Sequence, residues 1–375
     1  MFRRFSYTIS LLLILGLIIT ACAAPQSPAP TPAPTPSTQN PATPVPQLSR
    51  EQQLIAAAKA NGETEVVMWA LSWYYGPVEK AFEARYPFLK LKIWDPPGDE
   101  LEAKLIAEYQ AGKYSPDLLT QDAARLRHEQ AAGILQEYDW PNAQGWPFQP
   151  PHKFWVLDQL STRMPMYNTK LVSPTDIPKK WEDLNNSKWA GKSLISTSGS
   201  NWVIGFAYEL GDVTAAGVNW DRSIKFWKDV IKTTNPRVMS GFQGPLELLV
   251  AGDANIMLMA AGTTGLYNIR RGAPIDFAPF TKTYGDPWHI AMPKNPPHPN
   301  AAKLLADWLT SDEGSLVYSN LFPNPTVNPR IADKSYANQF YKNRGVEIFT
   351  LPSEMGTDKN YTDAARVWRQ DIIGR

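Results

Sequence analysis

The sequence has 375 residues, 43% of them hydrophobic and 19% charged, which is enough apolar material for two domains of ordinary size. Its 37 basic residues balance 36 acidic ones, so charge gives no case for a nucleic-acid partner or an acidic surface partner. With a single cysteine, the chain has neither a disulfide framework nor a site made of several thiolates.

The first residues have the order of charge and apolar character that is typical of a secretory signal. Arg3 and Arg4 precede an apolar run at 11–19, and small residues close the segment. A mature helix needs about 20 apolar residues to span a bilayer, so this run is too short. Residues 1–21 are therefore predicted to be an export signal.

The only cysteine stands at the end of this signal. The tetrapeptide Ile19-Thr20-Ala21-Cys22 resembles the lipobox of bacterial lipoproteins, whose cysteine is lipidated and becomes the new N-terminus. Each buried methylene adds about 0.8 kcal/mol of membrane affinity, so two acyl chains anchor a protein stably. We expect a lipid anchor at Cys22. The alternative is an ordinary signal with an unrelated cysteine near the cleavage point.

A proline-rich segment follows the cysteine. From Pro25 to Pro46, proline alternates mainly with Ala, Thr, Ser and Gln, and no residue is charged. Proline fixes φ and lacks a backbone donor, so the segment favours extended polyproline II and forms no core. Residues 22–48 are predicted to be a lipidated N-terminus and spacer. They would hold the domain at the outer face of the cytoplasmic membrane, or in a periplasm.

From residue 49 onward, predicted helices and strands alternate, which indicates an α/β domain. Ser49 caps the first helix, and the apolar run Val66–Ala70 is typical of a strand that is buried on both faces. Pro77 is expected to begin the second helix after a loop at 71–76. The predicted elements of this first unit, residues 49–160, are helices at 51–60, 77–85, 99–110 and 123–132 and strands at 66–70, 89–94 and 117–120.

Extended segments at 154–167 are expected to carry the chain into a second α/β unit at 161–272. Residues 273–375 are expected to return to the first unit and to end in helices. The predicted elements are strands at 192–196 and 255–260 and helices at 181–184, 220–233, 245–251, 300–309, 313–319 and 362–373. A further helix is expected to begin after Ser198 or Ser200, as its cap, and to run through Leu210. Two units joined by crossing segments predict two lobes around a ligand cleft.

Short motifs in a fixed order carry a family resemblance. They are Leu54–Lys59 with Gly62-Glu63, Val66-Val67, Ala81–Glu83 with Tyr86-Pro87, Pro116–Leu118, Trp181–Leu184, Trp189–Lys192, Ser198–Ser200, Gly252–Ala254, Gly272–Pro274, His298-Pro299 with Ala301–Lys303, and Ser311–Gly314. From about Leu54 to Ile331, the chain resembles the extracellular solute-binding proteins of ABC importers, in the branch that includes ferric-ion-binding proteins. The resemblance implies a two-lobed type II periplasmic-binding fold. It also implies capture of a small solute for an ABC permease; we expect a monomer without a cofactor.

Motifs of enzymes are incomplete in this sequence. Gly191-Lys192-Ser193 ends like a phosphate-binding loop, but Asn186 stands where that loop needs glycine. His128-Glu129 begins like a zinc-protease helix, but Ala132 stands where the second histidine is needed. The four histidines are dispersed, and none has a metal-ligand spacing. We therefore predict a protein that is not an enzyme; the alternatives are a tethered surface hydrolase and a solute-sensing subunit.

Candidate ligand-binding residues lie where loops follow strands or precede helices, because backbone amides there accept anions and polar groups. They are Trp73, Tyr74, Tyr75, Gln121, Asp122, Ser198, Gly199, Ser200, Thr263, Thr264, Tyr267 and Trp288. Arg163, in an extended segment, is a further candidate because a guanidinium binds a carboxylate or phosphate through two hydrogen bonds. The alternatives are structural: packing of a lid for 73–75, helix capping for Ser198 and Ser200, and a salt bridge for Arg163.

The mixture of aromatic walls and polar donors favours a small polar or anionic organic solute, or a metal chelate. Ferric members of the family carry adjacent tyrosines in the segment that corresponds to 262–268, where this sequence has only Tyr267. Ferric iron is best held by several anionic oxygens, so no metal site is predicted. Bare ferric ion stays an alternative because Tyr74 and Tyr75 are adjacent.

Overall fold

The computed structural model describes residues 47–70, 72–94, 98–150, 152–198, 201–321, 323–352 and 354–374. For 72–77, 98–99 and 358 only the backbone is described. The predicted signal, Cys22 and the segment Pro25–Pro46 lie outside these residues.

Helices and strands extend from Arg50 to Ile373 and largely alternate up to α8. The first elements are α1 (Arg50–Ala60), β1 (Glu65–Trp69), α2 (Ser72–Arg85), β2 (Lys90–Trp94), α3 (Gly98–Gln110), β3 (Leu118–Asp122), α4 (Ala123–Ala131) and β4 (Trp155–Asn168). The next are β5 (Ser193–Ser196), α5 (Trp202–Glu209), β6 (Val213–Thr214), β7 (Gly217–Val218), α6 (Asp221–Thr234), β8 (Arg237–Met239), α7 (Gln243–Ala251), β9 (Ile256–Ala261) and α8 (Gly262–Arg270). The last are β10 (Ile275–Phe277), β11 (Lys282–Ala291), α9 (Pro299–Leu309), α10 (Asp312–Leu321), α11 (Tyr336–Asn343), β12 (Glu347–Phe349), α12 (Asp358–Arg366) and the π-helical η5 (Val367–Ile373).

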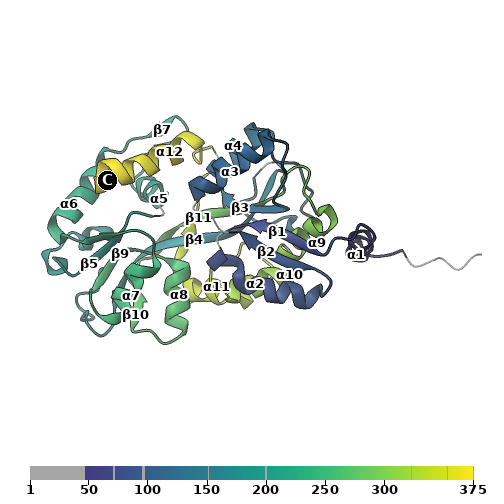
Figure 1. Cartoon of the computed structure of the whole chain (residues 1–375). Coiled ribbons are helices and arrows are strands. Elements are labelled where there is room, and N and C mark those ends of the chain that lie inside the picture. Colours follow the sequence, from purple (N-terminus) through teal and green to yellow (C-terminus); the bar gives the residue numbers. More distant parts are fainter. Residues whose placement is uncertain are drawn as a thin grey trace, which may run out of the picture. The chain divides into compact units, whose positions relative to one another are not determined.

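One mixed sheet runs through these elements in the order β2-β1-β3-β11-β4-β9-β5-β8, with β10 beside β4 and β12 beside β11. The strands β2, β1 and β3 form a parallel first subsheet, and β9, β5 and β8 form a parallel second subsheet. The long antiparallel strands β4 and β11 join them, since β4 pairs with β11 through its first half and with β9 through its second half. Figure 1 shows β4 and β11 crossing between the two subsheets.

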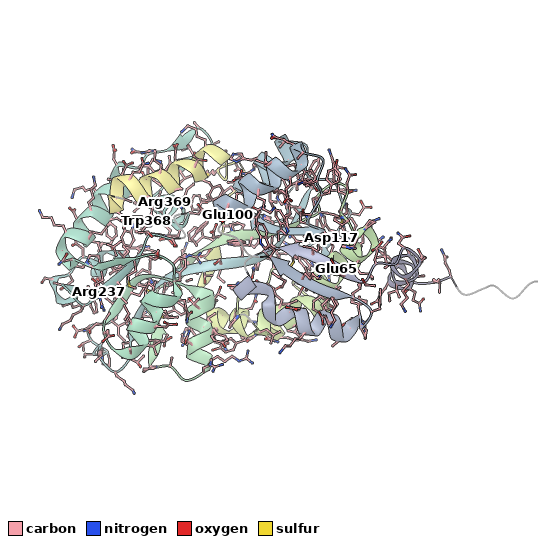
Figure 2. The ribbon with its side chains drawn as sticks, viewed as in Figure 1. Glu65, Glu100, Asp117, Arg237, Trp368 and Arg369 are labelled. Atoms are coloured by element: carbon pink, nitrogen blue, oxygen red, sulfur yellow. The ribbon has the colours of Figure 1, made fainter. Side chains whose placement is uncertain are left out.

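Each subsheet has its own apolar cores. Val66 and Met68 of β1 pack with α1, α2 and α9, while Trp69 packs with α3 and α4 on the other face. The second subsheet is covered by α5 and α6 on one face and by α7 and α8 on the other (Figure 1). Figure 2 labels Glu65 and Asp117 in the first subsheet region and Arg237 and Trp368 in the second. The sheet is therefore covered by helices on both faces, as expected for a parallel α/β arrangement.

The C-terminal segment packs on the second subsheet. The ring of Trp368 in η5 lies 4.6 Å from that of Trp202 in α5, measured between centroids. The indole Nε1 of Trp368 also donates to the backbone oxygen of Ser196 at the end of β5 (3.2 Å). By contrast, α9 and α10 pack on the first subsheet with α1 and α2. The final residues thus fix the end of β5 in place.

Several predicted elements are confirmed with small shifts in their ends. Ser49 and Gln52 form a reciprocal capping box at the start of α1. The predicted strand at 66–70 corresponds to β1, and its side chains reach cores on both faces. The mixed α/β fold class is confirmed as well.

Other local predictions are wrong. The second helix begins at Ser72 and not at Pro77, so Trp73, Tyr74 and Tyr75 lie in the first turns of α2 and not in a loop. Helix propensity of these aromatic residues is only moderate, and tertiary context overrides it. Gln121 and Asp122 belong to β3 because they pair with β11. Asn201, without a side-chain hydrogen bond, is the N-cap of α5, so Ser198 does not cap that helix.

Among the described residues, the α-helices α8 and α11 lie where the sequence analysis predicts none. The first turn of α8 contains Gly262, Thr263, Thr264 and Gly265, whose helix propensities are low. The other unpredicted helix is α11.

Among the described residues, no helix combines the length and apolar character that crossing a bilayer requires.

Candidate functional site

Polar side chains are buried along β4 and β11, which join the two subsheets, and along the neighbouring strand β3. Central strands covered on both faces normally carry apolar side chains, and buried polar groups are costly unless they are hydrogen-bonded. We call this set the polar belt. Its members are Thr120, Gln121 and Asp122 of β3, Asp158, Gln159, Ser161, Thr162 and Arg163 of β4, and Thr283, Asp286 and His289 of β11.

The strand register brings predicted site residues into this belt. Trp288 of β11 is paired with Asp122 on one side and with Gln159 on the other. Two residues earlier on β11, Asp286 is paired with Ser161 of β4. Gln121, Asp122, Arg163 and Trp288 therefore lie on three neighbouring strands, although they are distant in sequence.

Arg163 is the buried cation of the belt, with 4% of its surface exposed. Its Nη1 donates to the Ser161 hydroxyl oxygen (2.5 Å) and to the Thr162 carbonyl oxygen (2.9 Å). Its guanidinium carbon lies 4.8 Å from the ring centroid of Phe242. No carboxylate of the described residues lies within ion-pair distance of Arg163, so the structural salt bridge considered above is not found there.

Asp286 is a buried carboxyl group on the neighbouring strand, with 5% of its surface exposed. Its carboxylate makes no hydrogen bond to a side chain of the described residues. Burial raises the pKa of Asp286 to about 7, the positive charge of Arg163 opposes this rise, and the negative charge of Asp122 adds to it. Asp286 therefore changes its charge close to neutral pH.

Gln121 and Asp122 have structural partners at the start of α4. The amide of Gln121 donates to the carboxyl group of Glu129. Asp122 accepts from the backbone N–H of Arg125 (3.2 Å) as the N-cap of α4 and forms an ion pair with the Arg125 side chain. Burial raises the pKa of Glu129 to about 8, so this carboxyl group is protonated at neutral pH.

The histidine of the belt is also uncharged. Burial lowers the pKa of His289 to about 3, and the charge of Arg127 adds to this effect. His289 lies beside Gln121 in the register of β11 and β3. It therefore offers neutral ring nitrogens and no positive charge.

The two threonines of α8 use their hydroxyl groups inside the protein. Thr263 donates to Asn324, and the Asn324 amide donates in turn to Gln159 (2.6 Å). Thr264 donates to the carbonyl oxygen of Ala261 (3.2 Å). Tyr267, one turn further along, is 39% exposed and accepts from Arg271 (3.2 Å). In this conformation Thr263 positions the belt through Asn324 and Gln159.

Ser198 lies beside the Arg163 side of the belt. Its hydroxyl oxygen accepts from the backbone N–H of Gly241 (2.8 Å), and Gly241 precedes Phe242, the residue on which Arg163 stacks. Ser198 also lines a cavity of about 380 Å³. The other lining residues are Thr197, Val238, Met239, Ser240 and Arg369. Gly199 and Ser200, and the side chains of Trp73, Tyr74 and Tyr75, lie outside the described residues.

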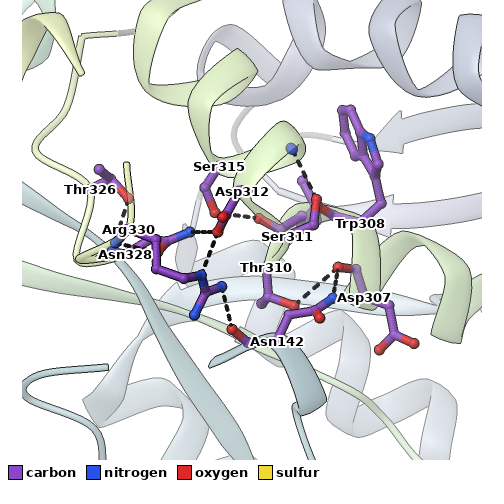
Figure 3. Close-up of polar contacts among 12 residues, drawn as sticks. Asn142, Asp307, Trp308, Thr310, Ser311, Asp312, Ser315, Thr326, Asn328 and Arg330 are labelled. Carbon is purple, nitrogen blue, oxygen red and sulfur yellow. Dashed lines mark hydrogen bonds and ion pairs between the residues drawn. The ribbon is translucent and has the colours of Figure 1, made fainter. Parts of the chain in front are cut away.

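A larger cavity of about 680 Å³ lies between α1, α2, α9 and α10. Its charged groups pair with one another: Arg50 with Asp307, Arg85 with Glu51 and Glu313, and Arg330 with Asp312. Figure 3 shows how Asp312 accepts from Asn328 (3.0 Å) and Arg330 (2.7 Å). Because these charges are matched already, this cavity is a weaker candidate for a solute site than the belt.

Sequence reasoning missed Asp286, Gln159 and Asn324. A usable signal was present for the first two, because polar residues interrupt apolar ones in both crossing segments, at 157–163 and at 285–290.

Among the described residues, no group of three or more His, Cys, Asp and Glu is placed to hold a metal ion.

Comparison with known proteins gives the family. A family model described as "Bacterial extracellular solute-binding protein" matches residues 78–344. The chain belongs to this family. The family implies an exported protein, and its members are solute-binding proteins.

Solved structures of such proteins share the fold. The substrate-binding protein of an ABC transporter from Agrobacterium tumefaciens is 13% identical, with 83% of this chain and 96% of that chain covered and a TM-score of 0.69. The GacH receptor of Streptomyces glaucescens is 14% identical (83% and 94% covered, TM-score 0.67). Apo ferric ion-binding protein A of Pasteurella haemolytica is 14% identical (83% and 99% covered, TM-score 0.66). The solute-binding protein thus has the type II periplasmic-binding fold.

Proposed function

We propose that this protein is the solute-binding component of an ABC import system. It captures a small polar or anionic organic solute, or a metal chelate, and delivers it to a permease without covalent chemistry. The observation that supports this most directly is the polar belt, in which Arg163 and Asp286 are buried without partners of opposite charge at ion-pair distance. Buried charges without partners are costly, and a solute that compensates them recovers that cost.

In this proposal the solute lies between two lobes, one built around the first subsheet and one built around the second, and the C-terminal helices α12 and η5 belong to the second. The belt lies on the crossing strands β4 and β11 and on the neighbouring strand β3. A solute closes the lobes only if it binds the closed state more tightly than the open one, since equal affinity shifts nothing.

Relatives of the same fold are named for unlike ligands. One is a ferric ion-binding protein, and another was solved in complex with acarbose. The class of ligand therefore has to be inferred from the side chains of the polar belt. Bare ferric iron needs clustered anionic oxygens, whereas the hydroxyl group of Tyr267 accepts from Arg271 and no described acidic cluster surrounds it. This supports an organic solute or a chelate.

Native mass spectrometry of the protein purified from its host tests the proposal. We expect one bound organic mass per chain, calorimetric binding of that compound to the emptied protein, and compaction on binding in small-angle scattering. Stoichiometric iron without an organic mass, together with a tyrosinate colour that is lost in Tyr267→Phe, would contradict an organic ligand. Turnover of the compound would contradict a binding role.

Lipid anchoring at Cys22 is a separate part of the proposal. It rests on the lipobox and on the proline-rich segment after it. Cys22→Ser is expected to move the protein from the membrane fraction to the soluble fraction, because the acyl chains supply the membrane affinity. The intact wild-type N-terminus should carry an acylated cysteine in mass spectrometry. A mature N-terminus at another residue, without lipid, would refute the anchor.

A further inference from the structure

Arg163 presents an unused edge of its guanidinium group. Nη1 is engaged by Ser161 and Thr162, whereas Nε is buried without a hydrogen-bond partner and Nη2 has none among the described residues. The N–H bonds of Nε and Nη2 point in the same direction, and this fork matches the two oxygens of a carboxylate. The hydrogen bonds of Nη1 and the ring of Phe242 hold the guanidinium plane in place.

Asp286 is a second charge without a partner at the same place in the sheet. It lies opposite Ser161, the residue whose hydroxyl group accepts from Arg163. The positive charge of Arg163 acts on Asp286, yet the two side chains form no ion pair. A guanidinium group and a carboxyl group are thus buried on neighbouring strands, each with unused hydrogen-bonding capacity toward a third group.

We propose that the solute is a small zwitterion, whose carboxylate binds the Nε and Nη2 edge of Arg163 and whose protonated amine binds the carboxylate of Asp286. This inference rests on the proposed solute-binding function. It names the class of solute and the two residues that recognise it. A zwitterion supplies a counter-charge to each group, and so it leaves the buried site neutral.

Other classes of solute fit these two residues less well. A phosphate also fits the guanidinium fork, but its double negative charge would face Asp286 and Asp122 nearby. A plain carboxylate satisfies Arg163 and leaves Asp286 without a donor. A plain amine satisfies Asp286 and leaves Arg163 without an acceptor. Only a solute with both groups compensates both charges.

Calorimetry with matched compounds tests this inference. The probes are glycine, β-alanine and the standard L-amino acids as zwitterions; acetate, propanoate and glutarate as carboxylates; methylamine and ethylamine as amines; and inorganic phosphate. Each compound is measured against emptied protein. We expect saturable binding of at least one zwitterion, with no binding of the compound that lacks its amine or its carboxylate.

Two variants assign the roles. Arg163→Lys keeps the charge but removes the planar fork, and Asp286→Asn keeps the shape but removes the charge; each is expected to weaken zwitterion binding by about 10- to 100-fold. Arg237→Lys and Asp253→Asn, at exposed positions, are the matched controls and should bind as the wild type does. Thermal unfolding of every variant identifies loss of folding. If Arg163→Lys does not fold, the affinity of Asp286→Asn and the pH profile of the wild type test whether the site binds a zwitterion.

The pH profile is a readout that a structural role would not produce. Among the described residues, the groups that interact electrostatically with Asp286 are Arg163 of β4, Asp122 of β3, Arg125 of α4, Tyr284 of β11 and Tyr361 of α12. A protonated amine binds Asp286 tightly only when the carboxyl group of Asp286 is ionised, and the pKa of Asp286 is about 7. Wild-type affinity should therefore be about tenfold weaker at about pH 6 than at about pH 8, and the profile of Asp286→Asn should be flat. Affinity that rises as the pH falls would contradict an ionised Asp286.

The outcomes separate this inference from the proposed function. A co-purified or calorimetric ligand that lacks either an amine or a carboxylate overturns the zwitterion and leaves solute binding intact. Undiminished zwitterion binding by both variants also overturns it. A protein that carries no solute from its host and binds no compound of any class contradicts both proposals.

Discussion

Replacing Gly314 with alanine is expected to lower the free energy of unfolding by about 2–4 kcal/mol. Gly314 lies in α10, and a β-carbon there would be 2.0 Å from the carbonyl oxygen of Trp308 in α9 and 2.7 Å from its carbonyl carbon. These atoms belong to the backbone, and they cannot rotate away as a flexible side chain can. Trp308 and Leu309 are buried in the core under the first subsheet, so α9 has little room to shift. Urea denaturation of the two proteins measures the difference.

Gly244→Ala in α7 is the matched control. A β-carbon there would meet only the methyl carbon of Met239, at 3.8 Å, which is an ordinary contact distance. Alanine has a higher helix propensity than glycine, so this variant is expected to be neutral or to gain up to about 1 kcal/mol. If Gly314→Ala behaves like Gly244→Ala, the close approach of α9 and α10 is not a constraint on this position.

The order of elements was largely predictable from local patterns. The capping box at Ser49 and Gln52 and the apolar run around Val66 and Met68 each determine structure within a few residues. Local sequence patterns did not predict the helices whose position depends on tertiary packing. The start of α2 lies before Pro77, and α8 forms from glycines and threonines because Gly262 lets the helix approach Thr162 closely: a β-carbon at Gly262 would be 1.8 Å from the Thr162 hydroxyl oxygen.

The candidate site was predictable only in part. Arg163, Gln121, Asp122 and Trp288 were singled out from their local sequence, and the strand register places them on neighbouring strands. Asp286 could not be singled out in this way, because only the pairing of β11 with β4 brings it opposite Ser161, next to Arg163. Such pairing joins segments far apart in sequence, and no local pattern encodes which residues will face each other.

Glu129→Gln is expected to stabilise the protein at neutral and alkaline pH, by an amount on the order of 3 kcal/mol at pH 7. Burial raises the pKa of Glu129 from 4.5 to about 8; the hydrogen bond from Gln121 opposes this, and the charges of Glu102 and Asp122 add to it. The unfolded chain thus loses its proton near pH 4.5, while the folded protein keeps it up to about pH 8. Wild-type stability therefore falls as the pH rises through this window.

Glutamine does not titrate, and its oxygen can still accept from Gln121, so the variant should not show this fall. The stability difference between the two proteins is expected to be smallest near pH 4, to grow with pH, and to level off above about pH 8. Glu100→Gln is the control, because Glu100 is exposed on the neighbouring helix α3 and is labelled in Figure 2. An exposed substitution should change stability by less than about 0.5 kcal/mol, without this pH dependence. Denaturant titrations at several pH values measure both. A difference between Glu129→Gln and wild type that is constant with pH would show that Glu129 is ionised in the folded protein.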